Sequence, residues 1–119
     1  MFLANSDGSI KIALTATPTT ELNFSSHFFD KDGLTNELWS HVGETDGTTL
    51  VDLVPAPALD KARAIQTMTI YNPNVAPVEL EITLHIDTES SVLWKGLLGE
   101  DQLLEWTHRG GWHTVNGYA

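Results

Sequence analysis

Residues 78–87 alternate apolar and polar side chains without a break, and this alternation constrains the fold more than any other feature. Successive side chains of a β-strand point to opposite faces, so the pattern predicts a strand with one buried and one solvent-facing side. A helix would distribute the same apolar residues around its circumference. The predicted buried residues are Val78, Leu80, Ile82, Leu84 and Ile86, and the predicted solvent-facing residues are Glu79, Glu81, Thr83, His85 and Asp87.

This strand belongs to a longer segment, residues 61–106, which predicts four consecutive strands joined by three short turns. Asn72, Pro73 and Asn74 precede the strand. These residues favour a turn because proline fixes φ and asparagine tolerates unusual backbone angles. Strands at residues 91–98 and 103–106 follow, with a Gly-Glu-Asp turn between them. The segment therefore predicts a meander of an antiparallel sheet.

Further short strands are predicted at residues 9–15, 22–29, 48–54 and 110–115, with Ile10, Ile12, Phe24 and Trp94 as additional core residues. Residues 34–42 have no clear period, and residues 43–47 predict a loop. Short strands at such spacing, separated by turn residues, are typical of sandwiches and small barrels. We therefore predict an all-β fold, a single antiparallel β-sandwich (jelly-roll or Ig-like) of about 7–8 short strands. Residues 1–7 would form an N-terminal arm and residues 8–119 the sandwich domain.

Composition excludes several classes of function. The chain has 119 residues, the size of one domain, and no cysteine, which excludes disulfides, thiolate zinc sites and cysteine nucleophiles. Its formal charge is −10, whereas nucleic-acid binding relies on basic groups that displace counterions from phosphate, so we expect no nucleic-acid partner. No apolar run approaches the roughly 18 residues of a membrane span, and the first residues do not resemble a signal peptide. We expect neither membrane insertion nor Sec-type export.

Three polar groupings are candidates for chemistry. Glu79 and Glu81 would project from one strand face about 7 Å apart, a spacing found in inverting glycosidases, but solvated surface charges are the better interpretation. His108 and His113 could meet across a hairpin, yet no histidines have the close spacing of a helix-borne metal site, and surface or hydrogen-bonded histidines are favoured. The acidic segments at residues 30–33 and 44–47 are interpreted as plain turns rather than weak calcium sites.

The four tryptophans, Trp39, Trp94, Trp106 and Trp112, are interpreted as core or subunit-contact residues in preference to a sugar-stacking platform. No serine lies in a Gly-x-Ser-x-Gly elbow, and no glycine-rich loop leads from a strand into a helix. The sequence therefore predicts no catalytic residues, no bound cofactor and no metal site, and an enzyme is the least favoured class of function.

Short segments of the chain follow one another in a characteristic order. It starts Met-Phe-Leu-Ala-Asn-Ser, continues through an apolar strand and a Thr-rich break, and reaches an Asp-x-x-Gly turn at residues 30–33. Residues 48–57 read Thr-Thr-Leu-Val-Asp-Leu-Val-Pro-Ala-Pro. Leu-Trp-Lys at residues 93–95, Gly-Glu at 99–100, Leu-Glu-Trp at 104–106 and Gly-Gly-Trp at 110–112 complete the series. In this order the segments resemble small accessory virion proteins of tailed bacteriophages over nearly the whole chain, and residues 34–47 depart most.

The resemblance implies a non-enzymatic role in the virion. We interpret the chain as similar to a capsid decoration (cement) protein that binds the major capsid protein on the outer surface of the shell, after synthesis in the host cytoplasm, and clamps neighbouring capsomers. A homotrimer on a local three-fold position suits such a clamp, because several weak contacts together give avidity. The alternatives are a tail, neck or fibre-associated module, with host-glycan contact as an option, and a small sugar-binding sandwich that uses Trp94, Trp106 or Trp112.

Two segments are predicted to contact the capsid or a neighbouring subunit, because both were expected outside the regular sandwich with exposed apolar residues. They are the N-terminal segment, with Met1, Phe2 and Leu3, and the segment 34–47, with Leu34, Leu38 and Trp39. On the strand at residues 78–87, a charge at Thr83 or His85 is expected to be tolerated, whereas Ile82→Asp is expected to unfold the domain because it buries an unpaired carboxylate.

Overall fold

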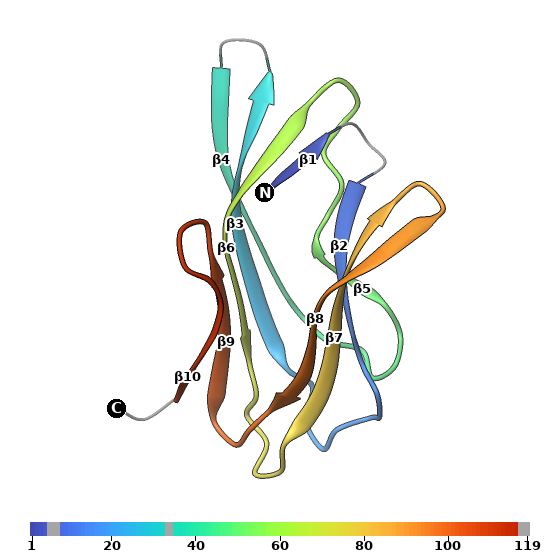
Figure 1. Ribbon diagram of the computed structural model, residues 1–119, viewed down its shortest axis with the longest axis vertical. Helices are drawn as coiled ribbons and strands as arrows, with labels where there is room; N and C mark the ends of the chain where they lie inside the picture. Colours follow the sequence, from blue (N-terminus) through green and yellow to red (C-terminus); the bar gives the residue numbers. More distant parts are fainter. Residues whose placement is uncertain (5–7, 33–34, 117–119) are drawn as a thin grey trace.

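The chain forms two antiparallel β-sheets packed face to face, as the computed structural model shows (Figure 1). The structure describes residues 1–4, 8–32 and 35–116. Within these ranges there are ten strands and no helix. In chain order they are β1 (Phe2–Ala4), β2 (Gly8–Leu14), β3 (Asn23–Asp32), β4 (Thr35–Glu44), β5 (Val51–Val54), β6 (Ala62–Tyr71), β7 (Val78–Ile86), β8 (Glu89–Leu98), β9 (Gln102–Thr107) and β10 (Gly111–Asn116).

The smaller sheet has four strands in the order β5-β2-β7-β8, and the larger has the order β10-β9-β6-β3-β4, with β1 as a sixth strand beside β6. Within each sheet, every pair of neighbouring strands is antiparallel. The predicted all-β antiparallel sandwich is confirmed. All eight strands expected from the sequence are present, and β1 and β4 are additional to them.

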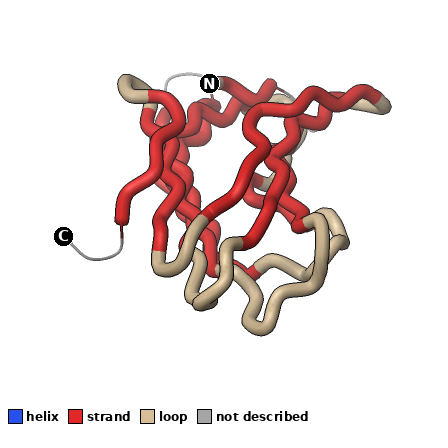
Figure 2. Tube along the Cα trace, turned by 60° about the horizontal axis from the view of Figure 1, so that its bottom comes forward, coloured by secondary structure: helices blue, strands red, loops and turns tan. Residues whose placement is uncertain are grey.

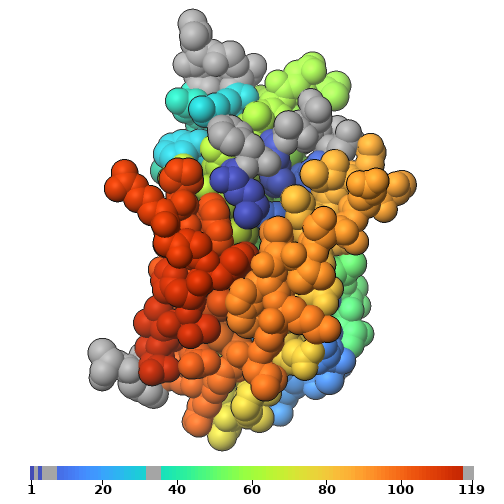
Figure 3. Space-filling view, in the orientation of Figure 1, coloured from blue at the N-terminus to red at the C-terminus, as the bar shows by residue number. Residues whose placement is uncertain are grey.

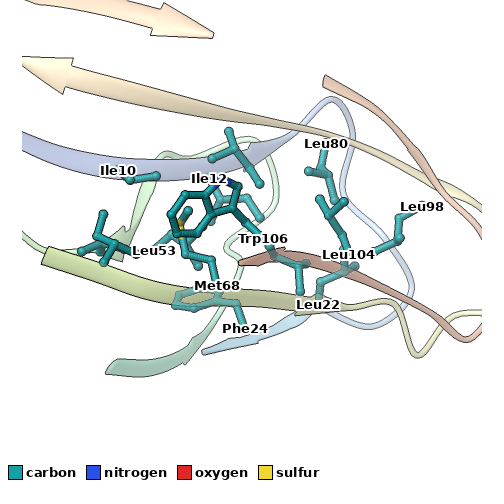
Figure 4. Packing of buried hydrophobic residues seen from close by; sticks show 14 of the residues in the cluster. Ile10, Ile12, Leu22, Phe24, Leu53, Met68, Leu80, Leu98, Leu104 and Trp106 are labelled. Atoms are coloured by element: carbon teal, nitrogen blue, oxygen red, sulfur yellow. The ribbon is translucent and has the colours of Figure 1, made fainter. Parts of the chain in front are cut away.

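Buried apolar side chains from both sheets meet in one layer between them (Figure 4). Ile12, Leu53 and Leu80 contribute from the smaller sheet, and Met68 and Leu104 from the larger, each with no exposed surface. Apolar area removed from water is the dominant favourable term in folding, at about 25 cal/mol per Å². The interleaved layer therefore stabilises the pairing of the two sheets as well as each strand within them.

Strand β7 follows the predicted alternation over its first half only. Leu80 and Ile82 are fully buried, whereas Thr83 is 7% exposed and Ile86 is 52% exposed, so the predicted exposure of Thr83 and the predicted burial of Ile86 are wrong. The register shifts at this point: Ile82 pairs with Trp94 and Thr83 with Val92 of β8, which leaves one extra residue on β8. Such a β-bulge bends the β7–β8 hairpin. Beyond it, the β7–β8 hairpin projects away from the opposite sheet (Figures 1 and 2).

On the other side of β7, Thr83 lies in register between Lys11 of β2 and Val92 of β8, and the neighbouring strands cover it. Its hydroxyl and His85 Nε2 form a hydrogen bond of 2.7 Å. The expectation that Thr83 tolerates a charge is therefore corrected. Of the other predicted core residues on the β7–β8 hairpin, Val78 is buried, and Leu84 and Trp94 are partly buried against the core.

Strand β4 occupies a region in which the sequence shows no period. It pairs with β3 along its full length, from Asn23↔Glu44 to Asp32↔Thr35, without a register shift. Gly43, which was expected in a loop, lies in this strand opposite Phe24. A Cβ at Gly43 would lie 2.9 Å from Cζ of Phe24, so the glycine makes room for the ring. No alternation was visible because most of β4 is exposed on both faces.

Four connections gather at the lower end of the sandwich in Figure 1, and Figure 2 turns this end forward. A buried pair of side chains, Asn72 and Asn74, ties three of them together, and we call this pair the asparagine clasp. Asn72 Nδ2 donates to the carbonyl oxygens of Leu98 (2.9 Å), Gly99 (3.1 Å) and Ala76 (3.1 Å). Asn72 Oδ1 accepts from the backbone N and from Nδ2 of Asn74, both at 2.9 Å.

Asn74 extends the clasp to the β2–β3 connection. Its Oδ1 accepts a hydrogen bond from Thr20 N, and its Nδ2 donates to Thr20 O, both at 2.8 Å. Buried polar groups are costly unless they are hydrogen-bonded, and here both amides have partners. The asparagines that the sequence assigned to a turn thus also join connections that lie more than fifty residues apart.

Candidate functional site

The acidic segment at residues 30–33 was interpreted as a plain turn, but its first three residues belong to strand β3, and Asp30 is engaged in a buried ion pair. Arg63 Nε and Nη2 donate to the two carboxylate oxygens of Asp30 at 2.7 and 2.9 Å. The guanidinium also donates to Pro55 O at 2.7 Å and lies 4.0 Å from the centre of the Phe28 ring. The Asp30 carboxylate is therefore neutralised by a bidentate pair inside the protein and is not presented to an external cation.

The other acidic segment, at residues 44–47, is also engaged internally. The carboxylate of Glu21 accepts hydrogen bonds from Thr45 Oγ1 and Gly47 N, both at 2.8 Å. Thr45 Oγ1 in turn accepts from Leu22 N at 2.9 Å. These bonds fix the turn between β4 and β5, which confirms the interpretation of this segment as a turn.

The histidines form separate contacts in different parts of the sandwich. His113 Nε2 donates to Glu105 Oε1 at 2.9 Å across β9 and β10, and His41 Nε2 donates to Asp52 O at 3.1 Å. Hydrogen-bonded histidines were the favoured interpretation, and His41, His85 and His113 confirm it. In the described parts of the chain, no three His, Cys, Asp or Glu side chains are grouped as a metal site would require.

The two glutamates considered as a catalytic pair have different surroundings. Glu81 lies 3.8 Å from Lys95 Nζ in a half-exposed ion pair. Glu79 lines a groove at the lower end of the sandwich. Their geometry is that of solvent-facing charges on an amphipathic strand.

Three of the four tryptophans contribute to the core. Trp106 is 8% exposed and lies directly opposite Trp112 on the β9–β10 hairpin. Trp94 and Trp112 are partly buried and pack against the core cluster. Their burial is that of packing residues, as the sequence suggested. Trp39 differs, since 50% of it is exposed on β4.

The N-terminal residues predicted as contacts lie within the larger sheet. Phe2, Leu3 and Ala4 pair with Ala64, Arg63 and Ala62 of β6, and Ile65 N donates to Met1 O at 3.0 Å. Figure 3 shows the first residues, in dark blue, between the red C-terminal strands and the orange β7–β8 hairpin. Leu3 is 2% exposed, so the expectation that it is exposed is wrong, and Met1 is partly buried. The short β1 completes the sheet beside β6 and covers part of the core.

The segment predicted as a second contact is an edge strand with exposed apolar side chains. Leu38 is 67% exposed, Val42 is 73% exposed and Trp39 is 50% exposed, and we call these three residues the β4 surface. Leu38 and Val42 lie on the face of the larger sheet that points away from the core, whereas Trp39 lies on the same face as its partner Phe28. Leu34, the other predicted contact in this segment, lies outside the described residues.

A groove of about 650 Å³ opens at the lower end of the sandwich. The β2–β3 and β6–β7 connections form its walls, and its lining includes the prolines Pro18, Pro73 and Pro77 together with threonine hydroxyls. The asparagine clasp fixes both walls relative to one another. A smaller hollow of about 330 Å³ lies beside Met1, Phe29 and His108. Sequence reasoning identified neither, because each is lined by residues far apart in the chain.

The described parts of the chain include no helix with the length and hydropathy to cross a bilayer. Comparisons of the chain with models of protein families, with curated proteins and with solved structures found no match.

Proposed function

We propose that this chain is a non-enzymatic structural protein of a tailed-bacteriophage virion. In this proposal it is a capsid decoration (cement) protein that binds the major capsid protein on the outer surface of the shell. It clamps neighbouring capsomers, and it acts as a homotrimer on local three-fold positions. The order of sequence segments described above motivates the virion role, and the β4 surface is the observation on the molecule that carries it.

The β4 surface favours a role in protein–protein contact. One ten-residue edge strand carries three exposed large apolar side chains, Leu38 and Val42 on its outer face and Trp39 on the face of Phe28. Aromatic and large apolar residues at the centre of an interface contribute most of its binding energy. Among the polar groups that were candidates for chemistry, Asp30 is engaged in the buried pair with Arg63, and Glu79 and Glu81 are solvent-facing charges. The net charge of −10 also suits a protein that lies on the outside of a particle filled with DNA.

Co-sedimentation with phage heads that lack the protein tests the proposal. Purified protein is added to the heads, and the bound amount is measured from gel-band stoichiometry. We expect saturable binding at a symmetry-related multiple of the capsomer number, on the order of hundreds of copies per particle. A tail or neck module would instead reach tens of copies at most and would bind isolated tails. Absence of binding to heads would refute the decoration role.

Two leucine variants of equal chemistry sharpen this test. Leu38→Glu places a charge on the β4 surface, whereas Leu59→Glu places the same charge on an exposed leucine of the β5–β6 connection. Leu38 and Leu59 are 67% and 73% exposed, so neither substitution disturbs the core. We expect Leu38→Glu to reduce the bound amount and Leu59→Glu to leave it unchanged. Equal binding of both variants would show that the β4 surface is not used on the particle.

A further inference from the structure

The free edge of β4 differs from the edges formed by β5, β8 and β10. Edge strands carry unpaired backbone groups, and natural proteins protect them with short length, charged residues, prolines or bulges. Strand β5 has four residues and is followed by Pro55, β8 contains a bulge and Lys95, and β10 has six residues. Strand β4 has ten residues in unbroken register with β3 and contains no Lys, Arg or Pro. Among the described strands it is as long as β8, but unlike β8 it has neither a register shift nor a lysine, and its charged residues are Glu37 and Glu44.

The side chains of β4 are arranged so that the strand is complementary to itself. When two copies of a strand pair antiparallel about a two-fold axis, directly opposed residues share a face, so their numbers have an even sum. With Ser40 on the axis, Leu38 of each copy faces Val42 of the other. In the same register, Trp39 faces His41. Both exposed apolar residues on the outer face thus meet an apolar partner.

Charge favours the same register. It places Glu37 opposite Gly43 and Glu44 opposite Asn36, so no two carboxylates face one another. Like charges directly opposite one another are destabilising, whereas apolar cross-strand pairs contribute about 0.2–1 kcal/mol each. Moving the axis to Trp39 or His41 would pair Leu38 with Ser40 or with Glu44 and would lose the apolar match. Of these three registers, the Ser40 register alone pairs Leu38 with an apolar residue and also keeps the acids apart.

We propose that β4 is a self-association strand, through which a second copy of this chain pairs antiparallel with the axis at Ser40. The two larger sheets then form one continuous sheet, and the half-exposed Trp39 packs against the partner's His41. The pairing does not depend on the proposed function. On a shell, copies at neighbouring three-fold positions meet at local two-folds, and the β4 pairing is the contact that would link their trimers.

A unique thiol at position 40 tests the register, because the chain contains no cysteine. Directly opposed antiparallel residues have Cα atoms about 4.5–5.5 Å apart, which is within the range that a disulfide bridges. We expect mild oxidation of the full-length Ser40→Cys variant to give a disulfide-linked dimer on a non-reducing gel. The matched control is Asn36→Cys on the same strand and face, which lies about 27 Å from its own copy and should stay monomeric on the gel. The Asn36→Cys/Glu44→Cys double variant should cross-link again.

A second measurement does not depend on cross-linking. Sedimentation velocity of the unmodified protein should show concentration-dependent association, and Leu38→Lys/Val42→Lys should raise its dissociation constant at least about tenfold. Leu59→Lys/Val75→Lys is the control, since these residues are 73% and 80% exposed and lie outside β4. Equal cross-linking at positions 36 and 40, or a protein that stays monomeric up to about 100 µM, would overturn the proposal. Binding to heads without β4 pairing would overturn this proposal and leave the proposed function standing. Pairing through β4 without binding to heads would do the reverse.

Discussion

Removing the side chain of Asn72 is expected to destabilise the protein more than any other exchange of a single polar residue for alanine in the lower loops. Asn72→Ala deletes five hydrogen-bonding contacts, in which the two N–H groups of Nδ2 are shared among three carbonyl oxygens and Oδ1 accepts twice. Three of them lie in buried surroundings, and two are partly accessible to water. At about 1 kcal/mol for each buried bond and about half of that for the others, the loss in unfolding free energy is about 4 kcal/mol.

Urea unfolding followed by tryptophan fluorescence measures this loss. The unfolding free energy falls by about 2 kcal/mol per M of urea, so the variant should have a urea midpoint about 2 M lower than the unmodified chain. Asn23→Ala, at an exposed position at the start of β3, is the control and should change the unfolding free energy by less than about 0.5 kcal/mol. An Asn72→Ala protein within about 1 kcal/mol of the unmodified chain, at an unchanged slope, would refute the reasoning. Water would then satisfy the backbone groups that Asn72 binds in the unmodified chain.

Three further exchanges test the fold at other points. Ile82→Asp buries an unpaired carboxylate and should unfold the domain, whereas Ile86→Asp, at a residue 52% exposed on the projecting hairpin, should stay folded. Circular dichroism distinguishes the two variants. An unchanged melting temperature for Ile82→Asp would contradict the strand register. Arg63→Ala leaves the buried carboxylate of Asp30 unpaired and should cost about 3–5 kcal/mol in urea unfolding; a loss of less than about 1 kcal/mol would mean that the pair contributes little. Gly43→Ala brings a Cβ to 2.9 Å from the ring opposite it and should cost about 1–3 kcal/mol by thermal unfolding, unless that ring can move aside freely.

The fold could be predicted from the sequence where strands are buried on one face only. Leu80 and Ile82 followed the alternation because β7 lies inside its sheet and faces the opposite sheet at these positions. Ile86 did not, because a local period does not reveal where the opposite sheet ends. Thr83 did not, because its cover comes from neighbouring strands and a bulge that depend on tertiary pairing. Strand β4 left no period because an exposed edge strand has no face that must be apolar.

The candidate site was predictable in part. Leu38 and Trp39 were expected to be exposed apolar residues, and the structure confirms their exposure while placing them on a strand rather than a loop. Leu3 was expected to be exposed but is buried, because a three-residue strand is too short to show a pattern and its partner Arg63 lies sixty residues away. The Arg63–Asp30 pair could not be predicted either, since no local signal joins residues 33 positions apart.

The position of β2 inside the smaller sheet has a consequence for synthesis of the chain. Its partners are β5 and β7, and Ile12 pairs with Ile82, seventy residues later. At about 5–20 residues per second, the ribosome adds that second residue about 4–14 s after the first. During this interval the apolar row of β2 has no complete sheet to join, so we expect the nascent chain to stay unfolded until most of it has emerged. Folding would then be largely post-translational and slow, as is typical of topologies dominated by distant contacts.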